Sequence, residues 1–379
     1  MANTLTSVMG FILARSLPLL RHQAYMLRLV NTDYSEEAAK PGQVINVEVP
    51  GDQTATDVTP GVTAPTPSNY TATTVPVQLT NWKHSDFHLT HKEMGEIANR
   101  EDYLPRRVEG AVKALAYALN ASVWANYKKV FGWVGTPGTA LYSTDADSRN
   151  VRMRLNQQLC PREGRALVLD HVADAAALGL ASFANFEQSG DQAVKIKGQI
   201  GEKFGLLHLS DDQVPTHTAG TGASYLVNDS GGMAIGETLV TVDTGSGTIL
   251  VGDVVTFAGH TQTYTVTAAL ASNQFSIYPP LIAAVADNAA VTVKGTGSSY
   301  VNCLGFTRDA FALAVRPLEQ TLRNIPGAST IASMTMIDEL TGIPLRLEVL
   351  QQYKQVVWDL DILWGTACVY PEMATRLVY

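Results

Sequence analysis

A single long amphipathic segment, residues 101–131, constrains this fold more than any other part of the sequence. Apolar side chains recur along it every three or four residues, which places them in one stripe on a helix. The stripe consists of Leu104, Val108, Ala111, Val112, Leu115, Leu119, Val123, Tyr127 and Val130. About 26 helical residues at about 1.5 Å each make a rod of roughly 40 Å. We therefore expect a helix that runs like a spine across a flat subunit.

The sequence before this helix predicts an arm and a projecting hairpin. Residues 5–30 have apolar positions at helical spacing, interrupted near Pro18, which indicates a broken amphipathic helix followed by an extended arm. Residues 44–49 and 75–90 each predict one long strand. Between them, residues 51–70 are dominated by Thr, Pro, Asp, Ala and Gly. A loop of this length is usually functional or disordered, so a projecting tip and a merely flexible loop both stay open.

A sharp change in composition marks residues 219–297. This stretch contains no arginine, and its one lysine is Lys294. Five short segments rich in Thr and Val are separated by Gly, Asn and Pro, a pattern typical of a small all-β module. The segments are TLVTVD, DVVTFAG, QTYTVTA, NQFSIYP and AAVTVKG. Because α/β patterns stand on both sides, we predict that this module is inserted into an α/β domain.

The bulk composition limits the class of protein. A chain of 379 residues suggests two or three compact units. Its 16% of charged residues lies below the roughly 25% of ordinary soluble domains, which suits a surface largely covered by neighbours. The net charge of −8 argues against a dedicated nucleic-acid binder, although loose contact with DNA stays possible. Cys160, Cys303 and Cys368 are scattered without a CxxC pair, so we expect reduced thiols.

The apolar N-terminus does not have the pattern of an export signal. No basic side chain precedes the apolar run, Arg15 and Pro18 interrupt it, and no small-residue cleavage pattern follows. No uninterrupted apolar stretch approaches the roughly 20 residues that cross a bilayer. We therefore expect a soluble protein that makes no use of a membrane.

The densest group of possible metal ligands lies in the second strand of the predicted hairpin. His84, Asp86 and His88 would share one face of a strand, whereas His91 would fall on the opposite face. A metal ion would need a further ligand from elsewhere in the chain. We therefore favour a solvated or interfacial face over a metal site.

Other candidate motifs predict turns rather than catalysis. Glycine patterns at Gly220, Gly245 and Gly295 lie outside a strand-to-helix junction and lack the Lys-Ser/Thr ending of a phosphate loop. The adjacent Asp211 and Asp212 are interpreted as a solvated turn. The sequence has no GxSxG elbow and no HExxH helix. We predict no catalytic residue, no cofactor and no metal, and hence a chain that is not an enzyme.

The order of these segments resembles that of the major capsid (coat) proteins of tailed double-stranded DNA bacteriophages. It is most similar to podovirus-type coat proteins with an inserted β-domain. The resemblance covers nearly the whole chain and depends on the joint order of the motifs, together with the long helix. The motifs are VNTDYSEEAAKPGQVINVEVP, the hairpin flank ending in DFHLT, KIKGQIGEKFGLLHLSDDQV, FTRDAFALAVRPL, LTGIPLRLEV and LDILWGTACVYPEMATRLV.

The resemblance implies an α+β fold, the phage major-capsid fold, in five parts. These are an N-terminal arm at 1–43, an extended hairpin loop at 44–80, a peripheral domain with the spine helix at 81–142 and 336–362, an axial domain at 143–218, 298–335 and 363–379, and an inserted β-domain at 219–297.

The resemblance also implies a function. Copies of the chain would form pentamers and hexamers and close into the icosahedral head shell around the phage genome, as part of a virion assembled in the host cytoplasm. Scaffolding and portal proteins would be partners, with loose contact to packaged double-stranded DNA. The hairpin would lie over a neighbouring subunit, which makes Thr54, Asp57, Thr59 and Tyr70 candidate interface residues. Two alternatives stay open, namely an encapsulin-like nanocompartment shell and a metal-dependent enzyme with a β binding module.

Overall fold

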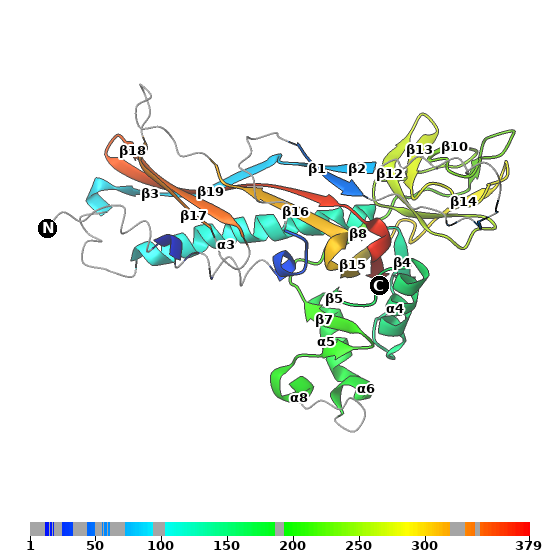
Figure 1. The fold of residues 1–379 in the computed structure, drawn as a ribbon, viewed down its shortest axis with the longest axis horizontal. Helices are drawn as coiled ribbons and strands as arrows, with labels where there is room; N and C mark the ends of the chain where they lie inside the picture. Colours follow the sequence, from blue (N-terminus) through cyan, green and yellow to red (C-terminus); the bar gives the residue numbers. More distant parts are fainter. Residues whose placement is uncertain are drawn as a thin grey trace.

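The computed structural model shows an elongated molecule with a barrel at one end (Figure 1). A long sheet lies along the helix α3, and a smaller α/β unit projects sideways from the middle of the molecule. The structure describes residues 12–14, 16, 18, 25–32, 44–49, 55, 57–58, 60, 73–93, 103–185, 193–318, 330–337 and 342–379. Of the predicted N-terminal helix, residues 12–14, 16 and 18 are described, and they are helical.

The predicted long helix is confirmed as α3 (Tyr103–Trp124), continued by the 3-10 turn η3 (Ala125–Lys129). It packs on an antiparallel five-stranded sheet. Four of the strands follow one another in the order β16-β19-β18-β17, and the fifth strand, β3, pairs with β19. The strands are β3 (Asn81–Thr90), β16 (Phe311–Arg316), β17 (Thr330–Ile337), β18 (Pro344–Gln352) and β19 (Gln355–Cys368). From Val108 to Val130 the residues of the predicted stripe are buried, and they share one core cluster with Leu347, Leu360 and Trp364.

The hairpin consists of β1 (Val44–Val49) and β2 (Thr73–Gln78), paired antiparallel. The prediction of one strand over 75–90 was wrong, because the chain leaves β2 at Gln78 and starts β3 in a different sheet. The break occurs where β2 crosses β19. A Cβ atom at Gly365 would lie only 2.2 Å from the carbonyl oxygen of Gln78, so the crossing needs a glycine there.

The α/β unit is built on a seven-stranded sheet in the order β4-β20-β15-β5-β7-β6, with β8 paired to β15. The strands are β4 (Gly132–Gly135), β5 (Arg165–Leu169), β6 (Gly201–Lys203), β7 (Leu206–Ser210), β8 (Thr216–Thr218), β15 (Ser299–Thr307) and β20 (Ala374–Val378). The helices are α4 (Ala146–Gln157), α5 (His171–Gly179), α6 (Ala181–Ala184) and α8 (Ala193–Lys197). Asp170 caps α5, since its carboxylate accepts the backbone N–H groups of Val172 and Ala173.

The module predicted at 219–297 contains a closed six-stranded barrel in the order β10-β13-β12-β11-β14-β9. Its strands are β9 (Tyr225–Val227), β10 (Leu239–Asp243), β11 (Val254–Phe257), β12 (Tyr264–Ala271), β13 (Gln274–Tyr278) and β14 (Ala290–Val293). All five predicted segments form strands, and the short β9 closes the ring. A closed barrel leaves no free strand edge, which suits a module that projects from its parent.

The strand pairing differs from three of the expected domain boundaries. β4, expected in the peripheral domain, pairs with β20 in the seven-stranded sheet. Residues 298–335 were assigned to one unit, but β15 joins the seven-stranded sheet whereas β16 and β17 join the long sheet. The chain changes sheets at the 3-10 turn η4 (Arg308–Ala310). Similarly, β19 stays in the long sheet through Cys368, beyond the expected boundary at residue 362. The chain therefore passes between the two sheets from β15 to β16 and again from β19 to β20.

Candidate functional site

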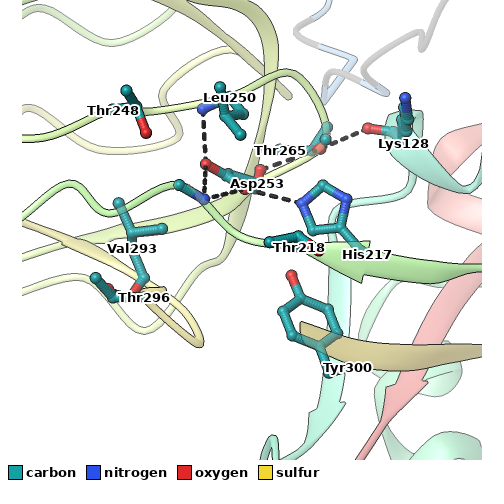
Figure 2. A network of polar contacts seen from close by, with 12 residues as sticks. Lys128, His217, Thr218, Thr248, Leu250, Asp253, Thr265, Val293, Thr296 and Tyr300 are labelled. Atoms are coloured by element: carbon teal, nitrogen blue, oxygen red, sulfur yellow. Dashed lines mark hydrogen bonds and ion pairs between the residues drawn. The ribbon is translucent and has the colours of Figure 1, made fainter. Parts of the chain in front are cut away.

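A buried polar network lies where the barrel joins the α/β unit (Figure 2). The chain reaches the barrel through β8 and leaves it through β15, and these two strands pair antiparallel. His217 of β8 lies opposite Tyr300 of β15. His217 supplies one of the contacts that hold the barrel against the rest of the molecule.

Asp253, in the turn before β11, is the centre of the network (Figure 2). Its carboxylate accepts the backbone N–H of Leu250 at 2.7 Å and that of Gly220 at 3.1 Å. It also pairs with Nε2 of His217 at 2.8 Å, and the Nδ1 atom of His217 lies 2.9 Å from the hydroxyl of Tyr127. When Nε2 carries the ring proton and donates to the carboxylate, Nδ1 accepts the hydroxyl proton of Tyr127.

Arg376 of β20 is the second charged group of the joint, and its side chain is fully buried. Its Nη1 donates to the carbonyl oxygen of Gly252 at 2.7 Å, and its Nη2 donates to Oγ1 of Thr265 at 3.1 Å. The guanidinium also lies 5.3 Å from the ring centroid of Tyr127. Burial lowers the pKa of Arg376 to about 10, so the group stays cationic at neutral pH. A buried cation and the nearby carboxylate of Asp253 therefore stabilise each other.

Further side chains connect the barrel to η3 and β4. Oγ1 of Thr265 donates to the carbonyl oxygen of Lys128, and Oγ1 of Thr263 donates to that of Phe131, both at 2.7 Å. The hydroxyl of Tyr278 at the end of β13 donates to the carboxylate of Glu372. Together these hydrogen bonds attach the barrel to the body, although Nε of Arg376 and the hydroxyl of Tyr300 are buried in the same region without a hydrogen-bond partner among the described residues.

The Asp253–His217–Tyr127 chain has the order of an acid–base relay, but its position does not favour catalysis. His217 and Tyr127 are both 5% exposed. Burial raises the pKa of Tyr127, which keeps its hydroxyl protonated. A general base must be able to reach the proton of a substrate, and these groups face one another inside the joint. The arrangement is suited to holding two parts of a molecule together.

The face predicted from His84, Asp86 and His88 is confirmed as one exposed face of β3. The alternate residues Phe87 and Leu89 are buried. Nδ1 of His84 lies 3.1 Å from the Asp359 carboxylate of β19. Within the described part of the chain, no group of three His, Cys, Asp or Glu residues could hold a metal ion.

His91 is not placed as predicted. The strand β3 ends at Thr90, and His91 begins a short helical turn. It therefore belongs to neither face of the strand.

One of the four candidate interface residues can be located. Asp57 is exposed. Thr54, Thr59 and Tyr70 lie outside the described residues. The contact of this tip with a neighbour stays a prediction.

The interpretation of Asp211 as a solvated turn residue was wrong. Its side chain is buried, and one carboxylate oxygen accepts both the amide of Asn120 at 2.9 Å and the indole N–H of Trp124 at 2.8 Å. Asn120 in turn accepts the backbone N–H of Met26 at 3.0 Å. Asp211 thus connects the end of β7 to α3, while the adjacent Asp212 is exposed.

The three cysteines are free and buried, as their spacing predicts. Burial raises the pKa of Cys368 to about 12 and raises the pKa of Cys303 as well. Both groups are therefore thiols rather than thiolates at neutral pH. No described helix combines the length and the apolar character needed to span a membrane.

Comparison with solved structures identifies chains of similar fold. A chain from "Mycobacterium phage Che8" is 13% identical, with a TM-score of 0.52 over 93% of this chain and 90% of that one. A chain from "Capsid structure of the Cyanophage P-SCSP1u" is 11% identical, with a TM-score of 0.49 over 92% and 85%. A chain from "Capsid of Ralstonia phage GP4" is 10% identical, with a TM-score of 0.46 over 92% and 87%.

The chain shares its fold with the Che8 chain, and its helices and strands confirm the predicted α+β class. No protein-family model matches the chain, and no curated protein is significantly similar in sequence.

Proposed function

We propose that this chain is a major capsid protein that assembles into the icosahedral head shell around the double-stranded DNA genome of a tailed bacteriophage. The observation that carries the proposal is the shared fold over 93% of the chain. The long sheet along α3, the β1–β2 hairpin packed against that sheet and the barrel at one end agree with it (Figure 1). Extended elements supply many modest contacts, which add up in a closed symmetric assembly.

The proposal includes the geometry and the partners of assembly. Copies of the chain form pentamers and hexamers in the host cytoplasm, aided by a scaffolding protein and a portal, and the shell touches packaged DNA only loosely. The long-sheet unit lies at the periphery of each capsomer, and the α/β unit lies near its axis. The hairpin tip, with Thr54, Asp57, Thr59 and Tyr70, contacts the adjacent subunit. This role is supported by the hairpin base, where Val47 and Val77 pack into one core cluster with Ala312.

Electron microscopy of the purified, concentrated protein tests the proposal. We expect closed shells of uniform diameter or free capsomers that close when a scaffold is supplied. Monomers under all assembly conditions, with zinc bound stoichiometrically at His84 and His88, would favour the enzyme alternative. Nucleic acid inside particles from infected cells separates a phage head from a nanocompartment that encloses protein cargo.

Deletion of residues 57–68 tests the proposed role of the hairpin. The described base of the hairpin stays intact in this variant, so a folded subunit with the circular dichroism spectrum of the parent is expected. Particle formation should fail or slow strongly. Normal particles from this deletion would show that the tip makes no essential contact.

A further inference from the structure

An open groove of about 370 Å³ lies where the barrel meets the body of the molecule. The hairpin, η3, the barrel and the end of β19 each supply part of its wall. The apolar lining includes Val75, Val251, Val266 and Val369. The exposed Lys128 and Lys129 of η3 also line it. The groove is therefore an apolar depression with cationic groups at one side, which suits an apolar side chain accompanied by a carboxylate.

A second surface, with the complementary character, is exposed on the barrel. Residues 229–237 and 281–287 run antiparallel as a two-stranded ribbon, which we call the acidic ribbon. Paired backbone hydrogen bonds join Met233 to Val285, and the N–H of Leu281 donates to the carbonyl oxygen of Glu237 at 2.9 Å. The side chains of Ile235 and Ile282 are 68% and 60% exposed.

The acidic ribbon carries negative charge beside these two isoleucines. Glu237 is exposed within it, and so is Asp287 near its other end. Within residues 219–297 there is no arginine, and Lys294 is the single lysine, so this segment carries an excess of carboxylates. Two ribbons facing each other would bring carboxylates together, which disfavours a symmetric barrel-to-barrel contact.

We propose that the acidic ribbon of one copy of this chain binds in the groove of the next copy. Ile235 and Ile282 cover the apolar lining, and Glu237 pairs with Lys129 at the rim. Apolar centres with charged rims are the usual anatomy of specific protein interfaces. The two isoleucines are exposed in the isolated subunit and do not line its groove, so the chain does not fill its own groove with them. This inference rests on the proposed shell function and names one contact within it.

The contact joins two different patches, so it is heterologous. Such contacts close into rings or continue into open chains, depending on the rotation between copies. Pentamers and hexamers of a shell are rings of this kind. The groove and the acidic ribbon would therefore link neighbours around one capsomer.

Charge reversal tests the pairing directly. We expect Lys129→Glu and Glu237→Lys each to raise the subunit concentration needed for assembly at least about tenfold, because each variant places like charges in the contact. The double variant, with both substitutions in one chain, should return that concentration toward the parental value. An equimolar mixture of the two single variants should also form oligomers that neither forms alone, measured by sedimentation velocity. Rescue in the mixture requires that the pair be between molecules.

Matched controls separate the contact from general effects of charge and polarity. Lys197→Glu changes an exposed lysine on α8, and Ile196→Ser changes an isoleucine that is 75% exposed on the same helix. Both should assemble like the parent, whereas Ile282→Ser should not. Circular dichroism checks that every variant is folded.

The outcomes distinguish this inference from the function on which it rests. The ribbon-in-groove contact alone would be overturned if the parental protein forms shells and Lys129→Glu assembles equally well. The same conclusion would follow if the double variant does not restore assembly. A parental protein that never assembles would overturn the proposed function itself.

Discussion

His217 and Asp253 form a pair with 2.8 Å between Nε2 and Oδ1, and their side chains are only 5% and 0% exposed. His217 belongs to the strand that leads into the barrel, and Asp253 belongs to the barrel itself. The pair therefore spans the boundary between two parts of the molecule. Its neighbours Arg376 and Tyr127 come from two further elements, so four segments of the chain meet at this point.

Replacing Asp253 should uncouple the barrel from the body. Asp253→Ala leaves the buried His217 and the backbone N–H groups of Leu250 and Gly220 without their acceptor, and it removes the carboxylate near Arg376. We expect the free energy of unfolding to fall by about 3–5 kcal/mol. Urea unfolding of the unassembled subunit, followed by tryptophan fluorescence, measures the change. Glu237→Gln alters an exposed carboxylate of the same barrel and should shift the unfolding midpoint little.

The neighbours Asp211 and Asp212 provide a matched comparison one residue apart. Asp211→Ala deprives the buried donors of Asn120 and Trp124 of their acceptor, which should lower the free energy of unfolding by about 2–3 kcal/mol. Asp212→Ala changes an exposed side chain and should stay within about 0.5 kcal/mol. Equal effects in thermal unfolding would contradict the assignment of Asp211 as the connection between β7 and α3.

Substitution by alanine should change the free energy of unfolding in opposite directions at two glycines. Gly365→Ala places a methyl group against the backbone of Gln78, so the hairpin base must shift, and we expect a loss of about 1–3 kcal/mol. Gly110 lies in α3 with nothing within 4 Å of an added Cβ atom. Gly110→Ala should therefore raise the free energy of unfolding by about 0.5–1 kcal/mol, because alanine favours a helix. Chemical denaturation of both variants checks the two signs together.

The buried His208 should make the subunit sensitive to mild acid. Its Nε2 lies 2.8 Å from Oγ of Ser148, and burial lowers its pKa from 6.5 to about 4. Between these two pH values the histidine takes up a proton in the unfolded chain but not in the folded chain. The free energy of unfolding therefore decreases as the pH falls from 6.5 to 4. The loss should be on the order of 3 kcal/mol when complete.

A pH series of urea unfolding curves tests the role of His208. The His208→Gln variant should lose this part of the pH dependence, even if its stability at neutral pH is lower. His171 is largely exposed, so the His171→Gln variant should keep the full dependence. An unchanged pH profile in His208→Gln would rule out this histidine as the cause.

Local patterns predicted the elements that depend on one continuous segment. The sequence predicts the stripe of α3 and the five barrel strands TLVTVD to AAVTVKG, because the spacing of apolar residues in each segment indicates which side chains are buried. The break between β2 and β3 was missed, since residues 75–90 have strand character throughout. What separates them is the crossing of β19 near Gly365, almost 300 residues later in the sequence. A contact at that separation leaves no sign near Leu79.

The polar joint shows a similar limit at the level of single residues. His217, Asp253 and Arg376 are far apart in the sequence, and none belongs to a motif with fixed spacing. Asp211 was taken as solvated because its position after a strand and beside a second acid is common in exposed turns. Its burial depends on Asn120 and Trp124, which reach it from α3. By contrast, the shared face of His84, Asp86 and His88 follows from strand alternation alone, and it was found.

Because β8 pairs with β15, the barrel is an insertion between two neighbouring strands of the body. These two strands belong to the sheet of the body. A gene segment that codes for the barrel could therefore be lost or exchanged without changing the strand order of that sheet. Among the contacts that any replacement would have to supply are an acceptor for His217 and a carbonyl group for Arg376. Lineages descended from such an exchange should therefore vary freely in the outer loops of the barrel and hardly at all at its foot.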